Sequence, residues 1–203
     1  MKNNIDIAVV GLGQIGNYLL NELKNKKKEI KLLTGKNINV VAISAKNINK
    51  KRKFKINKKI FYKNPLKILD NKKIHILFEC IGQSDGISKK IVEKALNNKI
   101  HVITPNKALI SKHGDYLSKI AENKKVNLEF EASVGGGIPI LRTIKEGLST
   151  NVITKVYGIL NGTCNYILTE MDKTNDNFKD VLKKAQSLGL SLIHISEPTR
   201  QSL

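Results

Sequence analysis

The sequence predicts an α/β fold in which a doubly wound parallel sheet is followed by a smaller α+β region. Two observations support this prediction. Short runs rich in β-branched residues alternate along the chain with segments of helical apolar spacing. The first of these runs, residues 5–10, has five apolar residues of six, which suits a strand buried on both faces of a parallel sheet.

The predicted elements alternate in a regular order. Apolar runs predict strands at residues 5–10, 39–44, 74–81 and 100–104, and a further strand is predicted at residues 126–132. Helical spacing predicts helices at residues 17–23, 88–98 and 109–123, whereas residues 46–72 are polar and irregular. A glycine cluster at 133–139 then marks a second region, with helices predicted at 140–148, 165–171 and 178–188 and a strand at 153–160. We therefore predict one domain over residues 1–132 and the start of another over residues 133–189.

The first strand runs directly into Gly11, Gly13 and Gly16, which have the G-x-G-x-x-G spacing. One glycine suits the tight turn, one lets the backbone approach a pyrophosphate, and one allows the next helix to pack closely on the strand. The amides at the start of that helix would then face the phosphates, and Gln14 and Ile15 within the glycine turn are expected to contact the cofactor. The alternative is an ordinary strand-to-helix turn without a ligand, but the order of strand, glycines and helix favours a Rossmann-type NAD(P)-binding domain.

The region after the second strand bears on which dinucleotide binds. An acidic residue about 20 positions beyond the glycines would bind the ribose 2′-hydroxyl of NAD. Residues 34–69 contain no Asp or Glu, and Ser44, Lys46 and Arg52 occupy the region instead. Because small polar and basic side chains suit a 2′-phosphate, the sequence favours NADP over NAD. Gly82, which comes after the strand at 74–81, is predicted to let the nicotinamide ribose come close.

Composition bears on whether the protein binds nucleic acid, enters a membrane or is secreted. The 203 residues include 36 Lys and Arg against 17 Asp and Glu, a formal charge of +19 that suggests nucleic-acid binding. However, the lysines are spread over the whole chain and aromatic residues make up only 5%, so solvated lysine faces explain the charge better. The sequence has no run of 18 apolar residues and no signal-peptide pattern, and Cys80 and Cys164 match no zinc or redox spacing. We therefore expect a cytoplasmic protein with reduced cysteines that binds neither nucleic acid nor a membrane.

Four strings carry a resemblance to a known family: GLGQIG at 11–16, HVITPNKALIS at 101–111, FEASVGGGIPI at 130–140 and GILNGTCNYILTEM at 158–171. In this order and spacing the chain resembles homoserine dehydrogenase up to residue 189. The resemblance implies reversible NAD(P)-dependent hydride transfer between L-homoserine and L-aspartate 4-semialdehyde, in threonine and methionine biosynthesis, and a homodimer for the full-length protein. Two alternatives stay open: another NAD(P)-dependent oxidoreductase of amino-acid metabolism, and a nucleotide-binding fragment without turnover.

The same resemblance implies the catalytic residue. Lys107, in the TPNK string, corresponds to an active-site lysine near the reacting carbon and the nicotinamide. A lysine partly removed from water between cofactor and substrate can exchange a proton with the alcohol as the hydride moves. Thr104 and Asn106 would lie beside it as contacts to the cofactor or as orienting groups. The alternative for Lys107 is an ordinary solvated lysine.

A monovalent cation site and a foreign tail are also implied. By resemblance, the cation is bound by the carboxylate of Glu131 and by the main-chain carbonyls of Val134, Gly136 and Ile138; the alternative is a strand-end glutamate with a glycine turn after it.

After residue 189 the acidic residues and second lysine expected of the family are missing. Residues 190–200, LSLIHISEPTR, resemble a translated sequencing adapter, so we interpret residues 190–203 as a non-native tail on a truncated enzyme.

Overall fold

The structure is a computed structural model that describes residues 3–50, 52, 56–70, 73–158 and 162–188. It contains two compact units, and the chain passes from the first to the second between Pro139 and Ile140. Each unit is described by itself, and the domain boundary expected at residues 132–133 stays a prediction. None of the described helices is long and apolar enough to cross a membrane.

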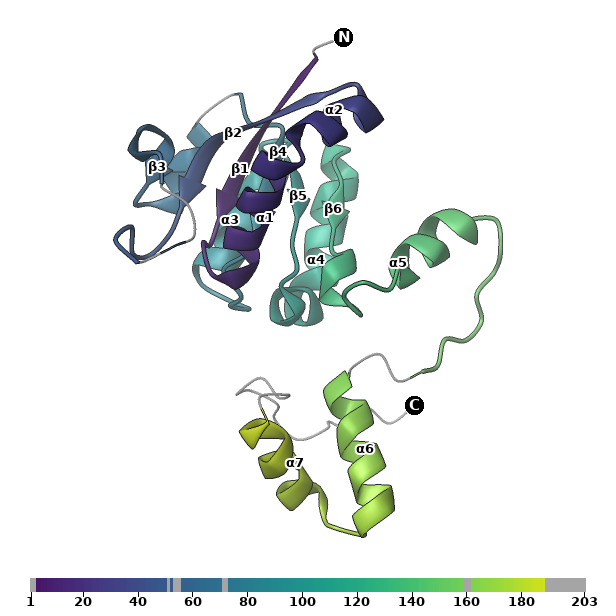
Figure 1. The fold of residues 1–203 in the computed structure, drawn as a ribbon. Helices are drawn as coiled ribbons and strands as arrows, with labels where there is room; N and C mark the ends of the chain where they lie inside the picture. The colour runs from purple at the N-terminus through teal and green to yellow at the C-terminus, as the bar shows by residue number, and fades with distance from the viewer. Residues whose placement is uncertain (1–2, 51, 53–55, 71–72, 159–161, 189–203) are drawn as a thin grey trace. The chain divides into compact units, whose positions relative to one another are not determined.

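The first unit is built on a six-stranded, fully parallel sheet (Figure 1). Its strands are β1 (Asn4–Val10), β2 (Asn37–Ser44), β3 (Phe61–Tyr62), β4 (Ile76–Glu79), β5 (His101–Ile103) and β6 (Leu128–Glu129). The order β3-β2-β1-β4-β5-β6 is that of a doubly wound dinucleotide-binding sheet and confirms the predicted fold class. Because β1 pairs with β2 on one side and β4 on the other, the winding reverses at β1. A ligand is therefore expected at the carboxyl end of this strand.

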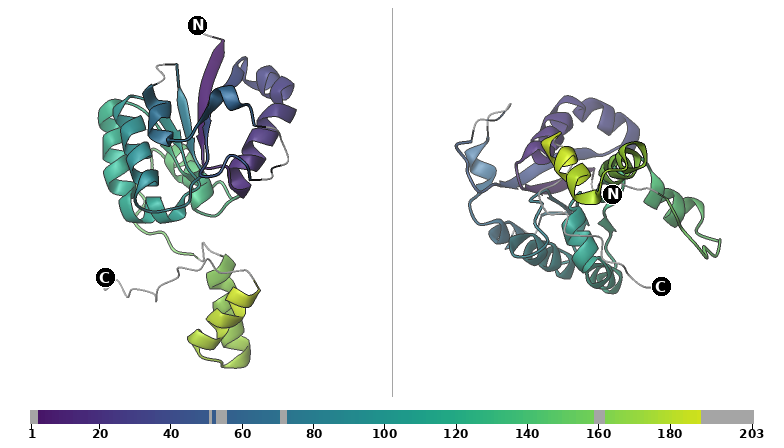
Figure 2. Two further views of the ribbon diagram at one scale, coloured as in Figure 1. Left: turned by 90° about the vertical axis from the view of Figure 1, so that its left-hand side faces the viewer. Right: turned by 90° about the horizontal axis from the view of Figure 1, so that it is seen from below.

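Helices cover both faces of the sheet. Figure 2 (left) shows α1 (Gln14–Asn25) and α2 (Lys27–Thr34) on one side, and α3 (Ile87–Asn97) and α4 (Lys107–Lys124) on the other. Along β1, Ile7 and Val9 pack with the apolar side of α1, whereas Ala8 and Val10 pack with the buried side chains of α3 and α4. Burial on both faces explains why this strand is apolar almost throughout.

Three parts of the first unit differ from the sequence prediction. Helix α2 (Lys27–Thr34) lies in a segment for which no element is predicted. Residues 46–72, predicted to be irregular, contribute the edge strand β3 and the short 3₁₀ helices η1 (Lys58–Ile60) and η2 (Pro65–Asp70). A two-residue strand is too short to produce a periodic pattern. The strand predicted at 126–132 is shorter than expected, because the chain turns at Phe130 into the 3₁₀ helix η3 (Glu131–Ser133).

The second unit contains α5 (Ile140–Arg142), which continues into the π-helical turn η4 (Thr143–Gly147), and the pair α6 (Gly162–Thr174) and α7 (Phe178–Ser187). The last two helices pack through Ile167, Val181 and Ala185. An ion pair of 2.7 Å between Lys184 Nζ and Glu170 Oε2 joins them on the surface.

The strand predicted at residues 153–160 is wrong over its described part. Residues 152–158 form no helix or strand, and the side chains of Val156 and Tyr157 are 59% and 87% exposed. An apolar β-branched run becomes a strand only where a neighbouring strand satisfies its backbone groups. The described part of the second unit contains no such strand. Residues 159–160 and the tail interpreted as non-native lie outside the described residues.

Candidate functional site

The turn between β1 and α1 contains backbone contacts that only glycine permits. Gly11 has φ +91°, and a Cβ atom there would lie 2.4 Å from the carbonyl carbon of Cys80. A Cβ atom on Gly16 would lie 2.0 Å from the carbonyl oxygen of Gly11. Around the equivalent position on Gly13 no atom lies within 4 Å. The first and third glycines therefore serve the packing of strand and helix, while the second leaves open space where a pyrophosphate would approach.

The start of α1 lies directly beside that open space. Gly13 is the N-cap of the helix, and no side chain accepts a hydrogen bond there. The first amides of an α-helix, which include those of Gln14 and Ile15, have no acceptor within the helix and carry partial positive charge. Both side chains are exposed, Ile15 by 56%. This end of α1 is thus arranged to bind an anion.

Gly82 and Lys107 come after the next two strands. Gly82 comes after β4 with φ +90°, and no atom lies within 4 Å of a Cβ position there. Lys107, with an exposed side chain, is the first residue of α4 and comes shortly after β5. Parallel neighbouring strands end at the same edge of a sheet. The structure therefore brings the glycine turn, Gly82 and Lys107 to one edge, as the sequence predicts.

The two residues predicted to lie beside Lys107 are buried. The hydroxyl of Thr104 donates to Glu79 Oε2 at 2.6 Å and accepts the N–H of Asn106 at 3.0 Å. Asn106 caps α4, because its Oδ1 accepts the N–H of Leu109 at 3.1 Å. The Thr104 hydroxyl thus has both an acceptor and a donor partner within the protein. The sequence patterns did not single out Glu79; the available signal was a carboxylate inside the apolar run IHILFECI.

Cys80, next to Glu79 at the end of β4, does not have the properties of a nucleophile. Burial raises the pKa of the Cys80 thiol to about 12, and the charge of neighbouring Glu79 adds to the shift. The thiol therefore stays protonated and unreactive. Cys164 is exposed, and both cysteines are free of disulfides.

The residues predicted to favour NADP come at the end of β2 and after it. Ser44 is buried at the end of the strand, where its carbonyl accepts the N–H of Gly11 at 2.9 Å, and Lys46 is exposed. Arg52 uses its guanidinium to close the loop, donating to the carbonyls of Asn47 at 2.7 Å and Ile48 at 3.0 Å. Its role in binding a 2′-phosphate stays a prediction, because these bonds would have to rearrange around that group.

The residues implied in a cation site lie in η3 and the turn after it. Positive φ angles of +75° at Gly135 and +86° at Gly137 curl the chain, and Ile138 N–H donates to the Gly135 carbonyl at 2.9 Å. The donors of the implied site are the carboxylate of Glu131 and the carbonyls of Val134, Gly136 and Ile138. One carboxylate with several carbonyl oxygens suits a hard cation of low charge. Among the described residues, no three His, Cys, Asp or Glu side chains gather as a transition-metal site would require.

A depression of about 330 Å³ lies at this edge, between the start of α1 and the ends of β4, β5 and β6. Its lining includes Ile15, Thr104 and Glu131, so it joins three residues from the predicted cofactor and cation sites. Gly82, Arg52 and Lys107 are not part of its lining.

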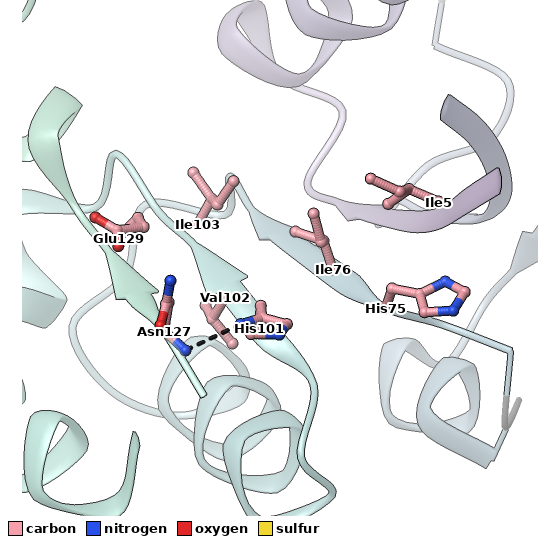
Figure 3. Close-up of a pocket in the computed structure, with 8 residues that line it drawn as sticks. All are labelled: Ile5, His75, Ile76, His101, Val102, Ile103, Asn127 and Glu129. Carbon is pink, nitrogen blue, oxygen red and sulfur yellow. Dashed lines mark hydrogen bonds between the residues drawn. The ribbon is translucent and has the colours of Figure 1, made fainter. Parts of the chain in front are cut away.

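A second pocket of about 330 Å³ is lined by eight residues (Figure 3): Ile5, His75, Ile76, His101, Val102, Ile103, Asn127 and Glu129. Its histidines have structural roles. His75 Nδ1 accepts the N–H of Asp6, and His101 Nδ1 accepts the N–H of Asn127, each at 3.0 Å. Both imidazoles lie at the amino ends of β4 and β5, opposite the edge where a doubly wound sheet binds its ligand. The depression beside α1 is therefore the better candidate for the functional site.

Comparisons with known proteins agree with this arrangement. The family model described as "Homoserine dehydrogenase, NAD binding domain" matches residues 11–131, and the model described as "Homoserine dehydrogenase" matches residues 139–192. The homoserine dehydrogenase of Neisseria gonorrhoeae is 37% identical over 185 residues, which are 91% of this chain and 42% of that protein. That of Bacillus subtilis is 35% identical over 187 residues, 92% of this chain and 43% of the relative.

A solved structure shows the same relationship. The homoserine dehydrogenase from Thiobacillus denitrificans superposes with a TM-score of 0.80 at 37% identity, covering 94% of this chain and 44% of that one. The chain thus spans less than half the length of these relatives. The NAD-binding model covers more than half of the chain, and the second model matches most of the residues beyond it. The chain belongs to the homoserine dehydrogenase family.

Proposed function

We propose that this chain is the cofactor-binding region and the first part of the catalytic region of an enzyme that interconverts L-homoserine and L-aspartate 4-semialdehyde. The observation that carries the proposal is the position of Lys107. It begins α4 just beyond β5, at the sheet edge that also holds the Gly11–Gly16 turn and Gly82. One edge therefore offers an anion site for a dinucleotide and an exposed ammonium group.

The residues of this edge have separate roles in binding and in proton transfer. The amides at the start of α1 bind the pyrophosphate. The open space at Gly13 leaves room for the pyrophosphate, and that at Gly82 leaves room for the nicotinamide ribose. A nicotinamide held there would supply the hydride acceptor for oxidation of homoserine and the hydride donor for reduction of the semialdehyde. Lys107 exchanges a proton with the oxygen on the reacting carbon, so that no unstable alkoxide has to form. Ser44, Lys46 and Arg52, with no acidic residue between 34 and 69, support NADP as the preferred cofactor.

Several properties of the whole protein belong to the same proposal. By its family membership the enzyme would serve threonine and methionine biosynthesis in the cytoplasm, act on a small molecule and assemble as a homodimer. We also propose that the first domain ends at residue 132 and that residues 190–203 are a non-native tail. Light scattering of a form that spans the length of the relatives tests the dimer.

The central experiment compares two lengths of the protein. Binding of NADPH and NADH is titrated for the 203-residue chain and for a form that spans the length of its relatives, and both are assayed for oxidation of L-homoserine. We expect both to bind NADPH and the longer form to oxidise L-homoserine. If the longer form binds NADPH but oxidises L-serine or L-threonine instead, it is another oxidoreductase. If neither form binds a dinucleotide, the proposal is wrong.

The proposed cation site predicts a specific effect on stability. The carboxylate of Glu131 and the carbonyls of Val134, Gly136 and Ile138 would hold a monovalent cation. Replacing choline chloride by sodium or potassium chloride at equal ionic strength should then raise the free energy of unfolding of the chain by about 1 kcal/mol, since the ion binds only the folded state. The Glu131→Gln variant should lose this increment in urea titrations.

The matched control for the cation site is Glu129→Gln, which removes an exposed carboxylate of β6 two positions away. This variant should retain the stabilisation by sodium or potassium. Equal stabilisation of the Glu131→Gln and Glu129→Gln variants would show that the cation acts elsewhere.

A further inference from the structure

Glu79, the last residue of β4, is a fully buried carboxylate. Its Oε1 accepts the backbone N–H of Ile81 at 2.8 Å, and its Oε2 accepts the hydroxyl of Thr104 at 2.6 Å. The amide Nδ2 of Asn106 lies 3.5 Å from Oε1. Among the described residues, the hydrogen-bond partners of Glu79 are a backbone amide, a hydroxyl and a side-chain amide, all of them neutral. The carboxylate is therefore stabilised by polar groups and not by a positively charged side chain.

The network extends from Glu79 to the two segments that border the proposed nicotinamide site. The Thr104 hydroxyl, which donates to Glu79, also accepts the backbone N–H of Asn106 at 3.0 Å. The Nδ2 of Asn106 donates to the carbonyl of Gln83 at 2.8 Å, next to Gly82, and its Oδ1 caps the helix that Lys107 begins. One carboxylate thus ties the loop after β4 to the first turn of α4.

A buried carboxylate without a positively charged partner lowers the stability of a protein core. Burying a carboxylate without a positive partner loses hydration that hydrogen bonds only partly replace, and an apolar side chain of similar volume is often as stable or more so. Departures from the most stable choice concentrate at functional sites. Glu79 lies at the carboxyl ends of β4 and β5, in the half of the sheet that does not carry the glycine turn. In a doubly wound fold this half receives the second mononucleotide, which here is the nicotinamide end.

We propose that Glu79, Thr104 and Asn106 are positioning residues for the nicotinamide end of the cofactor. The buried network fixes the loop at Gly82 relative to the start of α4, so that the nicotinamide and Lys107 meet in one arrangement. The inference rests on the proposed function in one respect: a dinucleotide must bind with its pyrophosphate at α1.

The test uses two ligands that share the adenine end. NADPH carries a nicotinamide, whereas 2′-phospho-ADP-ribose lacks it. Thr104→Val keeps the shape of the side chain but removes the hydroxyl, which leaves Glu79 Oε2 without its donor and Asn106 N–H without its acceptor. We expect this variant of the 203-residue chain to bind NADPH about tenfold more weakly, the effect of one lost charged hydrogen bond. Its affinity for 2′-phospho-ADP-ribose should stay within about twofold of the unmodified chain.

Three further variants separate positioning from general damage. Thr104→Ser restores the hydroxyl and should restore NADPH binding. Glu79→Gln leaves one acceptor oxygen, which cannot serve both the Ile81 N–H and the Thr104 hydroxyl, and should reproduce the selective loss if Thr104→Val fails to fold. Glu93→Gln removes a different carboxylate that holds α4, through a 2.6 Å bond from the Tyr116 hydroxyl, and should leave both ligands unaffected.

The outcomes distinguish this proposal from the proposed function. If the unmodified chain binds both ligands but the Thr104 variant loses them equally, or loses neither, the positioning role is wrong while the cofactor assignment stands. If the unmodified chain binds neither ligand, the cofactor assignment fails and the positioning role fails with it.

Discussion

Replacing Lys107 by alanine in a form that spans the length of the relatives should lower the turnover number for L-homoserine oxidation by about 10³-fold, the size of a lost acid–base group. The fold should be unaffected, because the Lys107 side chain is exposed and the N-cap of α4 is made by Asn106, which is unchanged. The free energy of unfolding should therefore change by less than about 0.5 kcal/mol. Initial rates of NADPH formation and a urea titration measure the two effects.

The matched control is Lys119→Ala, which removes an exposed lysine from the same helix, away from the sheet edge. It should leave the turnover number within about twofold, as surface substitutions do. A titration of NADPH completes the comparison, because loss of turnover in the Lys107 variant should exceed any loss of affinity. Equal turnover in the two lysine variants would remove Lys107 from the proposed mechanism.

Replacing Gly16 by alanine should destabilise the first unit by at least about 3 kcal/mol. The added Cβ atom would lie 2.0 Å from the Gly11 carbonyl oxygen and 3.1 Å from its carbon, which are backbone atoms that cannot rotate away. Relieving the contact requires α1 to move off β1, and Gly11 is itself held against the backbone of Cys80 and Ile81. The midpoint of urea unfolding reports the loss.

Gly13→Ala is the control for that change, because the same methyl group enters open space. Its φ of −75° suits alanine, so the variant should lose less than about 1 kcal/mol, the usual effect of alanine at an N-cap. The methyl group occupies the position proposed for the pyrophosphate, so NADPH affinity should fall even though the fold is retained. If the Gly13 variant were as unstable as the Gly16 variant, steric contact would not be the cause.

The sheet could be predicted because its information is local. Four of the five strands predicted in the first unit are short, mostly apolar runs, and the fifth, residues 126–132, alternates apolar and polar residues. The glycines at 11, 13 and 16 mark the switch from strand to helix. In β1 both faces are buried, so composition alone identifies the strand.

The parts that could not be predicted depend on distant partners. Residues 153–158 have the composition of a strand, but no described strand of the second unit pairs with them. Glu79 looks like one polar residue in an apolar run, and its importance appears only when β5 brings the Thr104 hydroxyl within 2.6 Å. In the sequence, Arg52 is a basic residue near a ribose site, whereas the structure shows its guanidinium bound to its own loop.

The order β3-β2-β1-β4-β5-β6 also has a consequence for how this protein forms during synthesis. The first strand to leave the ribosome is an interior one, and each later strand joins an edge that already exists: β2 and β3 on one side, then β4, β5 and β6 on the other. No strand of the described sheet has to be inserted between two that are already paired. The sheet can therefore grow outward from β1 as the polypeptide emerges, because every later strand finds its pairing edge already synthesised.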